Sequence, residues 1–176
     1  MINGLLKLSI FLFIGGLITS CIGFKNGASR KGQAHYETFF INDSTIQYFI
    51  KPLPFEGEVA VTADFTFRKM KNNFSQVALN FTIVSAKPET METFYLISHE
   101  ANEKLSEVDL IYKEKIKDHY KYRYTSHISF SAMKNFITED DTRIKYNNHV
   151  LTPTKKSKKA IDLLVADLFE FELLPQ

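Results

Sequence analysis

The chain of 176 residues contains one cysteine, Cys21, and no tryptophan. A single cysteine excludes a disulfide framework within the chain and a zinc site built from several cysteines. Glycine and proline, at 7 and 5 residues, are too few for a collagen-like or linker-rich protein. The 22 basic and 20 acidic side chains leave a net charge of only +2, which is not the basic composition of a nucleic-acid-binding domain.

Aromatic residues, by contrast, are abundant, with 16 Phe and 8 Tyr. Apolar residues make up 44% of the chain and charged residues 24%, a balance that is typical of globular proteins and argues against wholesale disorder. The aromatic content favours a core made of strands. The length indicates one domain, or one domain with an appendage.

Residues 1–20 have the organisation of a targeting segment. Lys7 is the only charged residue before residue 25, and an apolar or small run extends from Leu8 to Ile18. A run of this length is typical of a signal-peptide hydrophobic region, whereas a membrane-spanning helix needs about twenty apolar residues. The sequence therefore predicts a signal peptide over residues 1–20.

The segment Ile18-Thr19-Ser20-Cys21 resembles the lipobox of bacterial lipoproteins. In that family a diacylglycerol is attached to the cysteine thiol, and the peptide before the cysteine is then removed. The resemblance implies that Cys21 is lipidated, that the mature chain is 21–176, and that acyl chains such as palmitate hold it to a membrane of the cell envelope. The alternative is an ordinary signal anchor with a buried structural cysteine.

Residues 21–34 are predicted to be a flexible tether, because they combine glycines with small and polar residues. No acidic run follows Cys21. In some Gram-negative lipoproteins such a run marks export to the cell surface, so its absence favours a protein that faces the periplasm at the inner or outer membrane.

Residues 35–176 are predicted to form a single β-rich domain of the α+β type. Its antiparallel sheet is expected to be sandwich-like or barrel-like, with one or two helices in the C-terminal third. Apolar and polar residues alternate most clearly over Glu58–Arg68 and Val77–Ile83, which predicts a hairpin of two half-buried strands. Further strands are expected at 36–41, 45–50, 93–98, 107–113, 119–130, 143–146 and 149–152.

The two faces of the central hairpin lead to different expectations. Phe65 and Phe81 fall on the apolar faces and are predicted to be buried, whereas Asp64 and Asn80 are predicted to face water. Pro52, together with Pro54 and Pro88, is expected between strands, where a missing N–H costs little.

Helical spacing of apolar residues predicts helices over 131–141 and from 157 to about 168. Residues 169–173 alternate again, so the C-terminus is expected to be a helix followed by a strand.

The residues that carry chemistry form no catalytic, metal or cofactor pattern. His99-Glu100-Ala101-Asn102-Glu103 lacks the second histidine that a zinc-protease helix needs, and it follows a predicted strand, so a polar loop is expected. The acids Glu139 to Asp141 are expected on a solvated loop. The protein is therefore predicted to need no cofactor and not to be an enzyme.

The segment from Tyr120 to Tyr124 is the most distinctive local feature. As a strand it places Tyr120, Tyr122 and Tyr124 on one face, with Lys121 and Arg123 on the other. Tyrosine faces bind sugars, peptides and apolar ligands by stacking, so these three residues are a candidate ligand face. The alternative is that they continue the core face of Ile128 and Phe130.

Three functions are consistent with the sequence. The first is an envelope lipoprotein that binds or scaffolds a protein or glycan without catalysis. The second is a carrier or sensor of an apolar ligand in a β-cavity, and the third is a hydrolase of envelope polymers. Membrane lipid, through acylated Cys21, is the expected partner in each, and nucleic acid is not expected.

Overall fold

The computed structural model describes residues 35–71, 73–99 and 101–170. The predicted signal peptide (1–20), the tether (21–34) with Cys21, and residues 171–173 of the predicted C-terminal strand lie outside the described residues.

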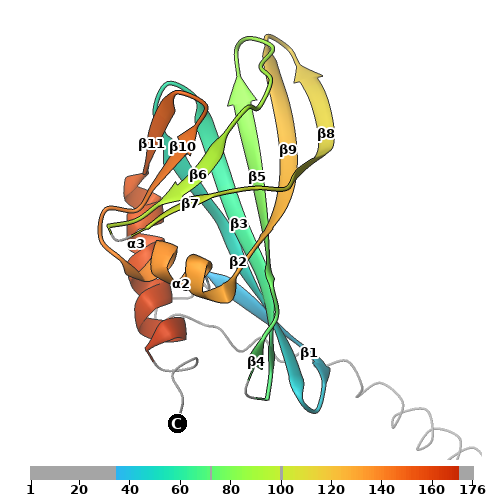
Figure 1. Cartoon of the computed structure of the whole chain (residues 1–176), viewed down its shortest axis with the longest axis vertical. Coiled ribbons are helices and arrows are strands. Elements are labelled where there is room, and N and C mark those ends of the chain that lie inside the picture. Colours follow the sequence, from blue (N-terminus) through green and yellow to red (C-terminus); the bar gives the residue numbers. More distant parts are fainter. Residues whose placement is uncertain (1–34, 72, 100, 171–176) are drawn as a thin grey trace, which may run out of the picture.

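An antiparallel sheet dominates the fold, as predicted, and its main path runs in the order β7-β6-β10-β11-β2-β3-β5-β9-β8. The short strand β4 pairs with β3, and β1 pairs with β2. The sheet curls into a half-barrel (Figure 1), which confirms the barrel-like alternative and not the sandwich. The strands are β1 Tyr36–Asn42, β2 Thr45–Glu56, β3 Ala60–Met70, β4 Asn73–Phe74, β5 Val77–Ser85, β6 Phe94–Ile97, β7 Asn102–Lys104, β8 Val108–Ile116, β9 His119–Ile128, β10 Arg143–Tyr146 and β11 His149–Pro153.

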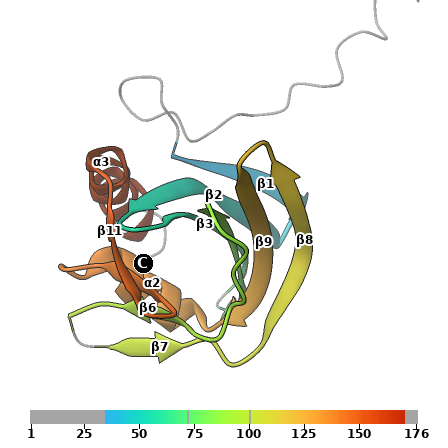
Figure 2. The same ribbon diagram turned by 90° about the horizontal axis from the view of Figure 1, so that it is seen from above.

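The core lies on the inner face of the curl, where alternate residues of each central strand meet. Phe65 on β3 and Phe81 on β5 are fully buried, as the alternation predicts. The Phe81 ring stacks on Phe94 with ring centroids 4.0 Å apart, and it also stacks on Tyr124 at 5.4 Å. Seen from above, the strands from β2 to β8 curve around one side of the fold, and α2 and α3 lie on the other side (Figure 2).

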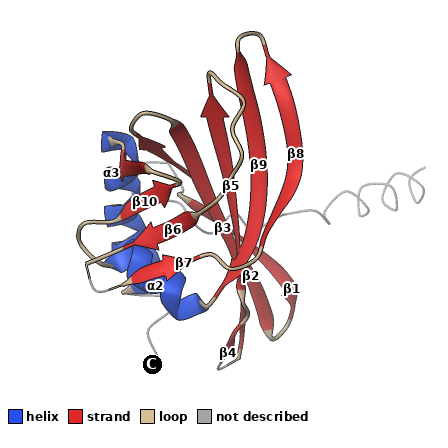
Figure 3. Ribbon diagram, turned by 45° about the horizontal axis from the view of Figure 1, so that its top comes forward, coloured by secondary structure: helices blue, strands red, loops and turns tan. Residues whose placement is uncertain are grey.

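Two helices in the C-terminal third lie together beside the sheet (Figure 3). Helix α2, Phe130–Thr138, begins after Ser129, whose Oγ accepts a hydrogen bond from the N–H of Ala132. Helix α3, Lys155–Leu164, is capped in the same way by Thr154 and continues into the π-helical turn η1, Val165–Phe169. Such N-caps satisfy backbone donors that a helix start leaves unpaired.

The proline-containing segment differs from its prediction. Strand β2 does not end before Pro52 but continues through Pro54 to Glu56. The pairing of β2 with β3 shifts between Ile50 and Leu53, so an irregularity accommodates Pro52 where a regular ladder would need its N–H. The predicted polar loop after His99 also differs, because Asn102–Lys104 forms the short strand β7 on the edge of the sheet.

Asp64 is the clearest correction to the predicted wet face of the hairpin. Its side chain is 1% exposed, although it points away from the aromatic core. Asn80 Nδ2 donates to Asp64 Oδ1 at 3.0 Å, and Arg123 Nη2 donates to Asp64 Oδ2 at 2.7 Å. Long neighbouring side chains therefore bury the carboxylate on the outer face of the sheet.

The two ends of the half-barrel differ in construction. The β1–β2 turn and strand β4 form one end, and the β8–β9 and β10–β11 turns lie at the opposite end (Figure 1). Within the described residues, no helix is long and apolar enough to cross a membrane.

Candidate functional site

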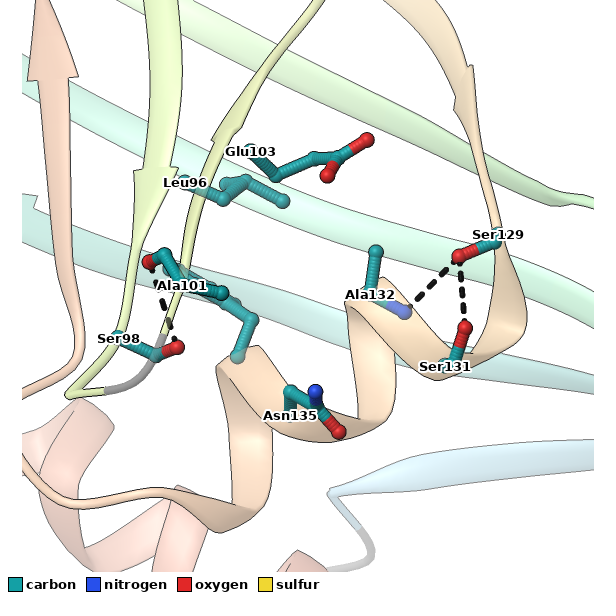
Figure 4. A pocket seen from close by; sticks show the side chains of 9 residues that line it. Leu96, Ser98, Ala101, Glu103, Ser129, Ser131, Ala132 and Asn135 are labelled. Atoms are coloured by element: carbon teal, nitrogen blue, oxygen red, sulfur yellow. Dashed lines mark hydrogen bonds between the residues drawn. The ribbon is translucent and has the colours of Figure 1, made fainter.

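A pocket of about 180 Å³ lies between the N-terminal part of α2 and strands β6 and β7 (Figure 4). Its polar lining comes from Ser98, Glu103, Ser129, Ser131 and Asn135. Ser129 Oγ accepts from Ala132 N–H at 3.0 Å and lies 2.9 Å from Ser131 Oγ, so the hydroxyl of Ser129 is occupied in capping the helix. Among the described residues that line the pocket, Glu103 is the one carboxylate, and none is a histidine. The described part of the lining thus offers no nucleophile with an adjacent base.

The predicted tyrosine face is largely covered. Tyr122 is 2% exposed and Tyr124 7% exposed, and Tyr120 is half-buried at the rim. The loop after β5 crosses this face, where Glu89 N–H donates to the Tyr122 hydroxyl at 3.1 Å. The structure therefore places two of the three rings inside the core.

Glu89 brings a carboxyl group to these phenols from a loop that sequence reasoning did not single out. Ser85 Oγ donates to Glu89 Oε1 at 2.7 Å. Burial, together with the nearby Glu89 carboxyl, raises the pKa of the Tyr146 phenol, and burial likewise raises the pKa of Tyr124. Both phenols are therefore held in the neutral form.

Lysines of β8 lie over the rim of this face. Lys113 Nζ lies 5.8 Å from the Tyr120 ring centroid and 5.3 Å from that of Tyr122, and Lys115 Nζ lies 5.5 Å from the Tyr120 ring. These distances suit cation–π contacts. The lysines therefore cover the part of the tyrosine face that the Glu89 loop leaves open.

Strand β8 is the most exposed element of the sheet. It is nine residues long and ends the strand order, and every residue from Asp109 to Ile116 is exposed. Leu110 is 51% exposed, Ile111 53%, Tyr112 38% and Ile116 44%. Long apolar edge strands are rare in soluble proteins because their unpaired backbone groups recruit other strands.

Sequence reasoning found β8 but not its exposure. The run Leu110-Ile111-Tyr112 could have indicated that exposure, because it breaks the alternation expected of a half-buried strand. The break corresponds to an irregularity in the β8–β9 pairing between Leu110 and Tyr112. The place of β8 at the edge follows from the order of strands in the sheet, and the sequence pattern of one segment does not reveal that order.

The histidines and acids bring no metal centre together. Across residues 35–71, 73–99 and 101–170, no three His, Cys, Asp or Glu side chains are arranged to hold a metal ion. Asp141, from the acidic cluster after α2, is paired with Arg143 at 2.7 Å. Cys21, the predicted lipidation site, lies outside the described residues.

Comparisons with known proteins add no homologue. No protein-family model, curated protein or solved structure matches this chain.

Proposed function

We propose that this protein is a lipid-anchored lipoprotein of the bacterial cell envelope that faces the periplasm, binds an extended segment of another envelope protein, and catalyses no reaction. The anchor is argued from the motif that ends at Cys21. The observation that carries the binding role is strand β8, an open edge with four large apolar side chains exposed.

A protein segment suits this surface better than a glycan. An extended peptide that adds to a sheet edge receives main-chain hydrogen bonds along its length, while alternate side chains provide specificity. Leu110, Ile111 and Ile116 are aliphatic. Tyr112 is the one ring among the four, and Lys121 Nζ already lies 5.6 Å from its ring centroid. The partner is therefore expected to present an apolar strand.

The same edge carries features that oppose unlimited self-association. The irregular pairing at Ile111 interrupts a flat edge, and Lys113 and Lys115 place charges on its inner side. Bulges and inward lysines are devices that limit edge-to-edge aggregation. A specific partner that contacts the exposed apolar side chains around Ile111 fits this pattern better than a chain of identical copies.

The two other functions consistent with the sequence have less support. A carrier of apolar ligands needs an internal space, but stacked rings of Phe81, Phe94 and Tyr124 fill the inner face of the curl. A glycosidase-type hydrolase needs two carboxyl groups across one cleft, whereas Glu103 is the one acid among the described residues that line the pocket beside α2.

Site-specific photo-crosslinking in cells tests the proposed edge. A photoreactive amino acid at Ile111 should crosslink to a discrete envelope protein, and the same group at Val150 should not. These positions form a matched pair, because the two residues are 53% and 50% exposed. In addition, Ile111→Asp should abolish co-purification of that protein, whereas Val150→Asp should leave it intact. Equal crosslinking at the two positions would contradict the proposal.

A further inference from the structure

The end of the half-barrel formed by the β1–β2 turn carries an apolar cluster, here called the tip patch: Phe39, Phe40, Ile41 and Met70. These residues are 48%, 66%, 51% and 40% exposed, respectively. Met70 pairs with Thr45 at the start of β2, so the patch spans the ribbon of β1, β2 and β3. Several large apolar side chains exposed together on one site mark an interaction surface.

The tip patch is apolar on both faces of the ribbon. Phe39 and Phe40 are consecutive in the regularly paired part of strand β1, so their side chains point to opposite faces. Ile41 lies at the irregularity between Phe40 and Asn42. One protein surface can cover one face of such a ribbon. Lipid, by contrast, surrounds a ribbon that inserts into it and therefore covers both faces of the ribbon.

Basic side chains lie beside the patch. Arg68 and Lys69 precede Met70 in β3, and Lys71 follows it; Arg68 and Lys71 are exposed, and Lys69 is half-buried. One acidic residue, Asp43, lies in the turn between β1 and β2. Apolar residues flanked by cations are the pattern of a surface that enters the headgroup region and attracts anionic lipids.

The position of the anchor allows this contact. Residues 22–34 separate Cys21 from His35, and at about 3.3–3.6 Å per residue they can extend to roughly 45 Å. Strand β1, from Tyr36 to Asn42, covers only about 23 Å at about 3.3 Å per residue. A lipidated Cys21 can therefore lie in the same membrane surface as the far end of β1.

We propose that the tip patch inserts between the headgroups of the membrane that holds Cys21, with Arg68, Lys69 and Lys71 against anionic lipid phosphates. This inference rests on the proposed lipid anchor and adds an orientation to it. The β8–β9 and β10–β11 turns, at the opposite end of the half-barrel (Figure 1), then point away from the membrane. The open edge of β8 stays accessible to a partner.

The depth of position 40 in a bilayer tests the insertion. The mature lipidated protein, residues 21–176, is placed in vesicles of phosphatidylethanolamine and phosphatidylglycerol, with a fluorophore on Phe40→Cys. Acylation consumes the thiol of Cys21, so the introduced cysteine is labelled alone. Lipids with a nitroxide near the headgroup should quench the label at position 40. They should not quench the same label on Val150→Cys, an equally suitable exposed site on β11. Equal quenching at both positions would overturn the proposal.

The cations provide a second, independent measurement. Arg68→Gln with Lys71→Gln removes two positive charges, and should lower the ratio of inserted to free tip by roughly thirtyfold on anionic vesicles. On vesicles of phosphatidylcholine the pair of changes should have little effect. An unchanged ratio on anionic vesicles would refute the role of the basic residues.

Flotation of the vesicles separates the inference from the function on which it rests. Protein that floats with an unquenched position 40 is anchored but does not insert its tip, which overturns the inference alone. If native mass then shows a dimer, a second copy covers the patch instead. Protein that does not float overturns the anchor, and the tip contact with it.

Discussion

Arg123 on β9 reaches across the intervening strand β5 to hold Asp64 on β3, with Nη2 and Oδ2 2.7 Å apart. Arg123 Nη1 also donates to Thr82 Oγ1 on β5, at 2.9 Å. The Asp64 side chain is 1% exposed and that of Arg123 is 25% exposed. One guanidinium therefore ties three neighbouring strands together on the outer face of the half-barrel.

This arrangement predicts that Arg123→Met is strongly destabilising. The change leaves the Asp64 carboxylate buried without its cation, which typically costs about 3–5 kcal/mol of unfolding free energy. Arg143→Met is the matched control, because Arg143 and Asp141 are also 2.7 Å apart but are 38% and 57% exposed. Exposed pairs contribute about 0–1 kcal/mol. Denaturant unfolding of both variants measures the difference, and equal losses would contradict the prediction.

The burial of Asp64 also shows where sequence reasoning ends. Alternation over β3 and β5 correctly predicted that Phe65 and Phe81 are buried, because side-chain direction in a strand is a local property. The exposure of the opposite face is not local. It depends on Arg123, which is distant in the sequence and lies two strands away in the sheet.

The same distinction applies to the candidate sites. A strand was predicted at Tyr120–Tyr124, but the loop that covers Tyr122 is positioned by Glu89, far from it in sequence. The exposure of Ile111 follows from the place of β8 at the end of the strand order. Neither fact can be read from the pattern of one segment. The signal peptide, tether and lipidated Cys21 remain predictions.

Two phenylalanine truncations should separate the core from the tip patch. Phe65 is fully buried, whereas Phe40 is 66% exposed. Phe65→Ala should cost about 3–5 kcal/mol through lost burial and an unfilled cavity. Phe40→Ala should change the unfolding free energy by no more than about 0.5 kcal/mol, although it removes part of the tip patch. Thermal and denaturant unfolding measure both, and a large loss with Phe40→Ala would show that the patch is part of the core.

His35, at the start of the described domain, should make the stability of the fold depend on pH. Burial, followed by the positive charge of Lys51, lowers the pKa of His35. The unfolded chain therefore binds more protons than the folded chain as the pH falls below about 6.5, so stability falls with pH in that range. The variant His35→Gln should lose less stability than the wild type between about pH 7 and pH 5.5.

Urea midpoints at both pH values measure this effect, and the difference between wild type and variant is the quantity of interest. His127→Gln, at an exposed histidine of β9, controls for replacing a surface histidine. A wild-type loss that matches the His35→Gln loss would contradict a contribution from His35.

The lipid anchor makes the most decisive prediction for function. Because only a thiol can form the thioether of the lipobox chemistry, Cys21→Ser should leave a precursor that retains residues 1–20 and carries no lipid. The wild-type protein from cells should instead have the mass of residues 21–176 plus a diacylglycerol and any further acyl chain. Ser20→Ala is the matched control, since a small residue before Cys21 is preserved, and it should be processed like the wild type. Intact mass and detergent partitioning report on all three proteins. A Cys21→Ser protein with the wild-type mass would contradict the proposed lipid anchor. An unprocessed Ser20→Ala protein would show that the cleavage needs more than a small side chain at that position.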